Sequence, residues 1–344
     1  MNLLDITGGS SGAWSAPVLA ALAPSAPGLA AKLGGNAVAS HSVLGTLAPY
    51  FVQRYGFSPA CEVVAWSGDN PCSVAGLGVR AAGDVAVSLG TSDTIFGLLA
   101  AATPGVDGHV FVNPVDPAGF MAMLCYKNGS LTRERVRDAA AGGAWPAFDA
   151  ALLGGAPGNG GRLGFFLDAA EITPTTPAAG DFRFEASAGA GDGGVRAVAA
   201  FPSPADDVRA AVQTKFLSMR AHSAAVGLAP VRRIIATGGA SANAAILQTL
   251  ADVFGAPVYT TSQPDSASLG AAYRAAHAHA CSRARAFVSF ADVLDHGLPG
   301  NAGRAGAERL ALAAQPRAAE AAAFTKLLPA VKAAEAAMLA AMAK

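Results

Sequence analysis

The chain has 344 residues, of which 52% are hydrophobic and 14% are charged. This composition supplies a core for one large or two ordinary domains, and it excludes a protein that is disordered throughout. Acidic and basic residues are equal in number, at 24 each, so no charge excess predicts binding to nucleic acid or to an anionic membrane surface.

The amino-terminal sixty residues predict helices. A helix-like start is followed by a second helical stretch from Ser42 to Tyr55, which ends at Gly56. The uncharged span from Ile6 to Ala31 is interrupted repeatedly by Gly, Ser and Pro, so it does not predict a membrane helix. We therefore expect no association with a membrane.

From Cys61 onward the pattern changes to strands that alternate with helices. The apolar run Val63–Trp66 predicts a buried strand, and Pro71 suits the first turn of the helix after it. Two later apolar runs are joined by the short turn Gly90-Thr91-Ser92, which predicts a β-hairpin. The predicted elements of this part are strand Val63–Trp66, helix Asn70–Arg80, strands Asp84–Leu89 and Thr94–Leu99, strand Phe120–Tyr126 and helix Leu131–Ala140.

The clearest helix of the chain begins after Ser203. Ser203 is a favourable N-cap, and Pro204 suits the first helical position. The acidic pair Asp206 and Asp207 lies where the helix dipole favours negative charge, and Gly227 ends the helix. The elements predicted after it are strand Arg233–Ala236, helix Ala242–Phe254, strand Pro257–Thr260 and helix Ser266–His277.

This order of elements predicts an α/β fold with a mixed β-sheet flanked by helices. The actin-like, ribonuclease-H-like domain has this order, and the elements alone leave other mixed sheets open. After about residue 285 the signal weakens, because 292–306 is rich in Gly and 308–344 is rich in Ala and contains Pro316 and Pro329. We expect this tail to be a surface helix or a mobile extension.

Asp69 is the candidate catalytic base. It follows the predicted strand Val63–Trp66 and has Gly68 and Asn70 as neighbours. A carboxylate in this position suits the removal of a proton from a hydroxyl group. Asn70 can donate and accept hydrogen bonds, so it is the candidate contact for substrate hydroxyls. The alternatives are that Asp69 caps the following helix and that Asn70 is an ordinary turn residue.

Two glycine-containing turns are candidate phosphate or nucleotide sites. Gly90 and Thr91 lie in a tight turn, where backbone N–H groups form concavities that bind anions. Gly238, Gly239 and Ala240 follow an apolar strand and open a helix, a geometry that suits a nucleotide. Neither pattern is specific, because most such turns bind nothing and a Gly-Gly pair also permits close packing of a strand against a helix.

A third glycine pattern carries no functional prediction. Gly189, Gly191 and Gly194 spell GxGxxG, which is typical of dinucleotide sites when a helix follows. Here the segment Val195–Phe201 reads as a strand, so we expect a hairpin loop.

The spacing of histidines and cysteines predicts neither a metal site nor disulfides. His277, His279 and Cys281 are two residues apart, and side chains at that spacing do not share a helix face. The four cysteines of the chain lie far apart without CxxC spacing. This usage favours reduced thiols and a cytoplasmic location.

Taken in order, three segments resemble the carboxyl-terminal half of the FGGY carbohydrate kinases, specifically the xylulose kinase branch. They are Ser67-Gly68-Asp69-Asn70-Pro71, Ser88-Leu89-Gly90-Thr91-Ser92-Asp93 and Ala236-Thr237-Gly238-Gly239-Ala240-Ser241-Ala242-Asn243. Segments between them are also similar to that branch, for example Asn113-Pro114-Val115-Asp116 and Glu171-Ile172-Thr173-Pro174. The resemblance extends from Met1 to about residue 278 and implies an actin-like ATPase fold.

The resemblance implies a sugar substrate and a phosphate donor. Asp69 would take the proton from the primary 5-hydroxyl of D-xylulose as that hydroxyl attacks the γ-phosphate of ATP, and Asn70 would contact the sugar. Gly90 and Thr91 would lie in a phosphate-binding motif. Mg²⁺ would accompany ATP by bridging its phosphates, and no residue is predicted to ligate a metal directly.

The resemblance also implies an adenosine site. Gly239, Ala240 and Asn243 match the adenosine-binding segment of the family, and Gly238, directly before them, is a further candidate for binding the cofactor. Trp145 would contact the adenine, although a Trp at the start of a helix is more often part of a core.

The resemblance divides the chain into three parts. Residues 1–60 resemble a remnant of the family's amino-terminal domain, residues 61–285 resemble its carboxyl-terminal domain, and residues 286–344 form the Ala-rich tail. The phosphate loop that opens the amino-terminal domain of the family has no counterpart here, so we expect a truncated chain with little or no kinase activity alone.

Several alternatives stay open at this point. One alternative is another FGGY sugar kinase. A second is a non-catalytic module that binds a nucleotide or a protein partner. The chain is also compatible with a fragment that aggregates through exposed apolar faces. The oligomeric state is left open.

Overall fold

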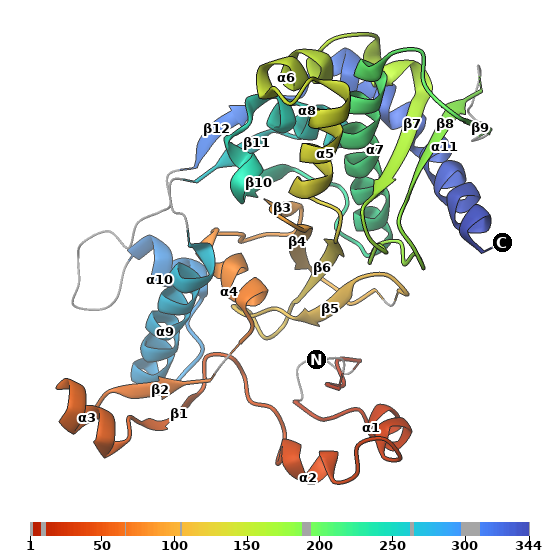
Figure 1. Cartoon of the computed structure of the whole chain (residues 1–344). Coiled ribbons are helices and arrows are strands. Elements are labelled where there is room, and N and C mark those ends of the chain that lie inside the picture. Colours follow the sequence, from red (N-terminus) through yellow and green to blue (C-terminus); the bar gives the residue numbers. More distant parts are fainter. Residues whose placement is uncertain are drawn as a thin grey trace.

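The computed structural model describes residues 3–7, 12–65, 67–103, 105–187, 194–261, 265–296 and 310–343. Within these ranges, the centre is a seven-stranded mixed sheet with helices on both faces (Figure 1). The predicted α/β class, with a mixed sheet flanked by helices, is therefore confirmed.

The central sheet combines parallel and antiparallel pairs. From one edge to the other, its strands are β12 (Ala311–Ala314), β11 (Val258–Thr260), β10 (Arg233–Thr237), β3 (Asp84–Leu89), β4 (Asp93–Leu99), β6 (Phe120–Tyr126) and β5 (His109–Val112). Strand β10 is parallel to both β11 and β3, and the other pairs are antiparallel. Ser88 lies opposite Thr237, so the carboxyl ends of β3 and β10 lie side by side at the same end of the strands. The predicted β3–β4 hairpin is confirmed, with Leu89 opposite Asp93.

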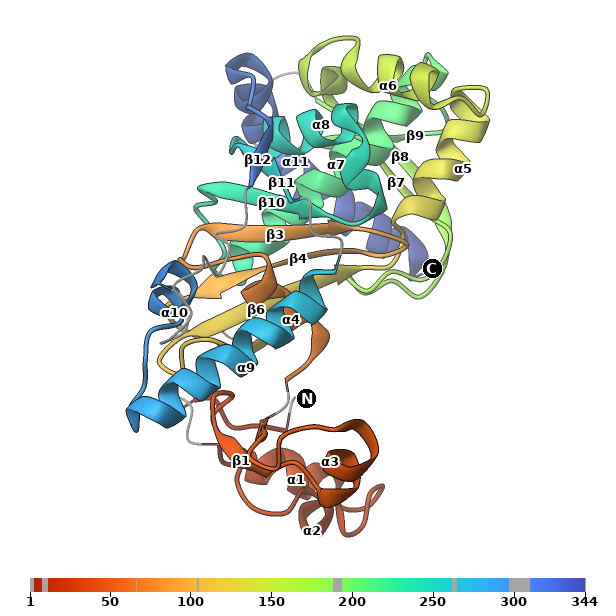
Figure 2. The ribbon, with the colours of Figure 1, turned by 90° about the vertical axis from the view of Figure 1, so that its left-hand side faces the viewer.

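Side chains of the central strands alternate between two cores. In β3, Val85, Val87 and Leu89 belong to one core and Ala86 belongs to the other, as the two-residue period of a strand requires. The first core is covered by α5 (Ser130–Ala140), α6 (Trp145–Leu153), α7 (Pro204–Ala225), α8 (Ala244–Phe254) and α11 (Ala318–Met342). On the opposite face lie α4 (Asp69–Gly76), α9 (Ser266–Ala284) and α10 (Phe290–His296) (Figure 2).

A smaller three-stranded sheet packs against α7. It consists of β7 (Arg162–Leu167), β8 (Gly180–Ala186) and β9 (Val195–Val198), with a short 3-10 helix, η1 (Pro157–Gly161), before it. Strands β8 and β9 pair antiparallel, which confirms the strand predicted after Gly194. Gly189 and Gly191 of the GxGxxG pattern lie outside the described residues.

The predicted helix after Ser203 is confirmed, together with its cap. The Ser203 hydroxyl accepts a hydrogen bond from the Ala205 N–H at 3.2 Å, and the Asp206 carboxylate accepts one from the Ser203 N–H at 3.2 Å. This reciprocal capping satisfies N–H groups that an α-helix leaves without partners at its start.

The prediction for the amino-terminal part is wrong between Ser42 and Tyr55. The amino-terminal part as a whole contains α1 (Ala16–Leu22), α2 (Leu29–Leu33), β1 (Val43–Thr46), α3 (Pro49–Tyr55) and β2 (Glu62–Val64). Thus the first half of the predicted helix Ser42–Tyr55 is a strand. Pro49 explains the boundary, because proline has no N–H for a helix interior but is favoured at the first helical position.

The apolar run before Asp69 is also not a buried strand of the central sheet. Among the described residues, strand β2 pairs only with β1, in a separate two-stranded sheet, and Val63 is 38% exposed. A short apolar run alone does not distinguish a central strand from such a ribbon. Trp66 lies outside the described residues.

The Ala-rich tail is part of the core, contrary to the expected surface helix or extension. Strand β12 pairs with β11 at the edge of the central sheet, and α11 buries Phe324, Val331 and Met338. Helix α11 also continues through Pro329. Neither α11 nor any other helix in the described ranges is long and apolar enough to cross a membrane.

Candidate functional site

Two glycine-containing turns meet at the carboxyl ends of two neighbouring strands of the central sheet; we call this place the sheet edge of the candidate site. Gly90 follows β3, and Gly238 follows the parallel strand β10. Gly238 has φ of 85°, and a Cβ atom placed on it would lie 2.7–2.8 Å from three backbone atoms of Leu89. Only glycine fits this backbone conformation and this approach. The neighbouring Gly239 has no atom within 4 Å of such a Cβ, so the chain leaves open space there.

The turn that contains Gly90 and Thr91 is fixed to the start of α5. The Ser130 N–H donates to the Gly90 carbonyl at 2.8 Å, and the Gly129 N–H donates to the Thr91 carbonyl at 3.1 Å. A Cβ on Gly129 would lie 2.6 Å from both carbonyl oxygens. The turn therefore has a set position relative to α5.

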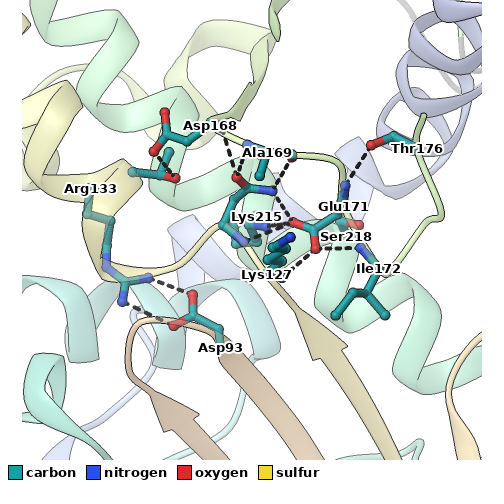
Figure 3. Close-up of polar contacts among 12 residues, drawn as sticks. Asp93, Lys127, Arg133, Asp168, Ala169, Glu171, Ile172, Thr176, Lys215 and Ser218 are labelled. Carbon is teal, nitrogen blue, oxygen red and sulfur yellow. Dashed lines mark hydrogen bonds and ion pairs between the residues drawn. The ribbon is translucent and has the colours of Figure 1, made fainter. Parts of the chain in front are cut away.

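A buried ion pair fixes the residue that follows the same turn. Asp93 follows the turn and has no exposed surface, and Arg133 of α5 is 5% exposed. Arg133 donates to both carboxylate oxygens of Asp93, at 2.6 and 3.1 Å (Figure 3). Such a bidentate pair fixes direction as well as distance, so it orients β4 and α5 relative to each other.

A second polar network holds the chain between β6 and α5. The Glu171 carboxylate accepts hydrogen bonds from the Lys127 N–H at 2.5 Å, from the Asn128 side chain at 3.0 Å and from the Lys215 ammonium at 2.8 Å (Figure 3). Burial opposes the ionisation of Glu171, but Lys215 and these hydrogen bonds hold the pKa of its carboxyl below its usual value. Asn128 also bonds the backbone of Asp168, so the network ties this chain segment to the end of β7.

Helix α6 is held beside the glycine turn of β10. The Asn243 side chain accepts from the Ile246 N–H at 2.9 Å as the N-cap of α8, and it donates to Asp149 of α6 at 2.7 Å. Trp145 begins α6 and is 37% exposed. Trp145 lies four residues before Asp149, a spacing that brings two residues near each other on a helix surface.

Asp69 and Asn70 lie on another element. They are the first two residues of α4, and Asp69 is exposed. The Asp69 carboxylate accepts from the Asn70 N–H at 2.8 Å and from the Asn70 side chain at 3.1 Å. No hydrogen bond in the described part of the chain connects Asp69 to either glycine-containing turn.

A cavity of about 550 Å³ lies next to Asp69. Ser67, Gly68 and Pro71 contribute to one wall, and the remaining walls come from the segments 3–40 and 110–117. The residues that flank Asp69 in sequence are therefore accessible from this cavity.

The structure thus brings some of the predicted residues together. One group lies at the sheet edge of the candidate site: Gly90, Thr91, Gly238 and Asn243. Gly239 and Ala240 form the short 3-10 helix η2 (Gly239–Ala242) at the same place. Helix α6, which begins with Trp145, is bonded to this group through Asp149. Asp69 and Asn70 come from α4, on the opposite face of the sheet.

Sequence reasoning missed the residues that support these turns. Asp93 lies directly after the Gly90 turn, but its partner Arg133 is forty positions away. The pairs Glu171–Lys215 and Asn243–Asp149 are also far apart in sequence. An acidic residue after a glycine turn was the only local signal, and spacing does not identify its partner.

Comparisons with known proteins agree with this architecture. The model of the FGGY family of carbohydrate kinases, C-terminal domain, matches residues 85–279. The chain is 47% identical over 300 residues to xylulose kinase 2 of Arabidopsis thaliana, covering 86% of this chain and 52% of that protein. It is 49% identical over 279 residues to the xylulose kinase of Mus musculus, covering 80% of this chain and 47% of that protein. The chain spans about half the length of these curated relatives.

Solved structures show the same fold at low sequence identity. The xylulose kinase from Rhodospirillum rubrum superposes with a TM-score of 0.72 at 19% identity, over 96% of this chain and 61% of that chain. The gluconate kinase from Lactobacillus acidophilus superposes with a TM-score of 0.75 at 17% identity, over 99% of this chain and 63% of that chain. These likenesses confirm the actin-like ATPase fold of the sugar kinases. Together with the match over 85–279, they place the chain in the FGGY family of carbohydrate kinases.

Proposed function

We propose that this chain takes part in the ATP-dependent phosphorylation of D-xylulose at its 5-hydroxyl, as the part that binds the nucleotide and supplies the base. The observation that carries the proposal is the meeting of the Gly90 and Gly238 turns at one sheet edge, beside α6. Two curated relatives that are 47% and 49% identical are xylulose kinases, which supports D-xylulose as the sugar.

The residues at this edge fit an adenine nucleotide. Gly239 leaves open space where a side chain would stand, and η2 begins directly there. Phosphate oxygens suit backbone N–H groups at such turns, so Gly90, Thr91 and Gly238 would hold the phosphates. Gly239, Ala240 and Asn243 would hold the adenosine, with Trp145 against the adenine. ATP, together with Mg²⁺, would supply the phosphoryl group for transfer.

Asp69 would act as the general base. Its two hydrogen bonds from Asn70 fix the direction of the carboxylate, and its exposure on α4 leaves it accessible to a substrate. The carboxylate would accept the proton of the sugar hydroxyl while the hydroxyl oxygen bonds to the γ-phosphorus and ADP departs. Asn70 keeps further donor and acceptor capacity for the sugar hydroxyls.

The location and the partners follow the same reasoning. All four cysteines are free, which supports a cytoplasmic location. The partner would be the small-molecule sugar, without a nucleic acid or a membrane.

The proposal is tested by calorimetry with ATP and by a coupled assay with D-xylulose and ATP. We expect ATP to bind, and we expect the truncated wild-type chain to turn D-xylulose over only weakly. Asp69→Asn should abolish that weak turnover, because a general base contributes about two to four orders of magnitude to the rate. The variant should leave ATP affinity unchanged, because Asp69 has no described bond to the glycine turns. Turnover that survives in Asp69→Asn would refute the assigned base. ATP binding with no detectable turnover of D-xylulose, in place of the weak turnover expected, would favour a non-catalytic nucleotide-binding module.

A further inference from the structure

Trp145 is held in a fixed orientation although it is partly exposed. Its ring meets Phe148 edge-on, with ring centroids 5.3 Å apart and planes at 77°. Phe148 is fully buried, so this contact anchors the indole to the core. A partly exposed indole that is anchored in this way loses little conformational entropy when a planar ligand stacks on it.

One face of the indole is already covered by Arg137 of α5. The guanidinium carbon lies 4.7 Å from the centre of the Trp145 ring, which is within the range of a cation–π contact. The guanidinium is itself fixed, because it donates to Asp138 at 2.8 Å and at 2.6 Å. Arg137 therefore stacks on the indole from one side and cannot swing away without losing these bonds.

Helix α6, which begins with Trp145, is bonded to the candidate nucleotide site. Asp149, four residues later, bonds Asn243 at the start of α8. The Gly238 turn and the open space at Gly239 lie directly before Asn243 in the chain. A planar base bound there would have one face of the indole left to stack on, because Arg137 covers the other.

We propose that Arg137 is a positioning residue for nucleotide binding, because it fixes the plane of Trp145 so that the uncovered face of the indole receives a purine base. The inference rests on the proposed function, since it takes the nucleotide site as given. Arg137 does not touch the nucleotide in this arrangement; it acts through the indole.

The experiment compares Arg137→Gln with the wild-type chain by calorimetry, using ATP and tripolyphosphate as probes. Loss of the cation–π contact should weaken ATP binding about two- to five-fold. The affinity for tripolyphosphate should not change, because that probe lacks the base. Arg135→Gln is the matched control, since Arg135 lies on the same helix but pairs with Asp168 and Asp181. It should leave both affinities unchanged.

Fluorescence, measured on variants that are folded under the assay conditions, gives a second readout that a lower stability of the folded protein would not produce. The emission of Trp145 is isolated as the difference between each protein and its Trp145→Phe counterpart. Arg137→Gln should shift this emission to longer wavelength and raise its quenching by iodide, and Arg137→Lys, which keeps a cation, should show a smaller effect. If the glutamine variant does not unfold cooperatively, Arg137→Met, which keeps the aliphatic stem, replaces it with the same expected results.

The outcomes separate the inference from the function on which it rests. If the wild-type chain binds ATP and Arg137→Gln binds it equally well or more tightly, the positioning role is overturned and the proposed function stands. Equal weakening for ATP and tripolyphosphate also overturns it. If the wild-type chain does not bind ATP, the proposed function fails and this inference fails with it.

Discussion

Asp93 and Arg133 form the most deeply buried ion pair around the candidate site. Asp93 has no exposed surface, and Arg133 bonds both of its oxygens. An isolated charge at such a position is strongly unfavourable, whereas a pair with good geometry is tolerated. If either charge is present at this buried position, the Gly90 turn therefore needs the other charge as its partner.

Arg133→Met should lower the free energy of unfolding by about 3–5 kcal/mol, because it leaves Asp93 buried without a partner. Urea denaturation measures this change. Adding Asp93→Asn to the same variant should recover part of the loss, since no buried charge then remains. Arg196→Met is the control, because the Arg196–Glu185 pair is exposed; it should change stability by at most about 0.5 kcal/mol. Similar losses for Arg133→Met and Arg196→Met would contradict this account.

Gly238 and Gly239 are neighbours with different structural requirements. Gly238 has φ of 85° and contacts the Leu89 backbone, whereas Gly239 has open space around its α-carbon and no positive φ. The two positions therefore offer a matched pair of substitutions.

Gly238→Ala should destabilise the chain by about 1–3 kcal/mol, because the new methyl group meets backbone that cannot move aside. It should also weaken ATP binding about tenfold or more, since the turn shifts. Gly239→Ala should leave the melting temperature unchanged. Thermal unfolding of the two variants decides the point, and equal melting temperatures would show that the close approach to Leu89 is not restrictive.

At the scale of elements, one histidine links three segments. His222 of α7 contacts Glu335 of α11 at 2.8 Å and Asp107, before β5, at 3.2 Å. Burial acts to lower the pKa of His222, but the two carboxylates outweigh it and raise the pKa above its usual value of 6.5. The protonated imidazole thus binds α11 to α7 more strongly than the neutral ring does.

The contribution of His222 to stability should be present in full below about pH 6.5 and should decrease as the pH rises through the raised pKa of the folded state. The free energies of unfolding of the wild-type chain and of His222→Gln should therefore differ more at about pH 5.5 than at about pH 8.5. Urea titrations at both pH values measure this. A gap that is constant or widens with pH would contradict the assigned role.

At the scale of the whole molecule, the last thirty or so residues complete the core. Strand β12 closes one edge of the central sheet, and α11 covers α8 and α7. Arg317 joins the start of α11 to Asp252 of α8, which has no exposed side-chain surface. The Asp252 carboxylate raises the pKa of Arg317, so the guanidinium of this link stays charged.

A chain that ends at residue 310 should lose cooperative unfolding, because removal of β12 and α11 exposes the apolar side chains that α11 now covers. Circular dichroism during thermal unfolding and the binding of a hydrophobic dye measure the effect. A chain that ends at Met342 is the control and should unfold like the full chain. Cooperative unfolding of the shorter chain would show that the tail is dispensable for the fold.

The local features of this fold could be predicted from the sequence. The β3–β4 hairpin and the capped helix after Ser203 were predicted correctly, because turn residues, caps and periodicity act within a few positions of the chain. The candidate residues Gly90, Thr91 and Gly238 were named from the same kind of local signal.

The Ala-rich tail and the strand β1 could not be predicted in this way. Alanine fits a surface helix as well as a buried one, and the burial of α11 depends on its packing against α7 and α8. Strand β1 forms because β2 is available as its partner. In both cases a contact with a distant segment decides the conformation.

The sequence by itself determined the α/β class, the glycine turns and the presence of a helix directly after the candidate base. Only the tertiary structure decided that the turns after β3 and β10 lie side by side, that Arg133 neutralises Asp93, and that Arg137 covers one face of Trp145. The physical reason is that local preferences are set by neighbouring residues, whereas these contacts join segments whose approach depends on the packing of the whole core.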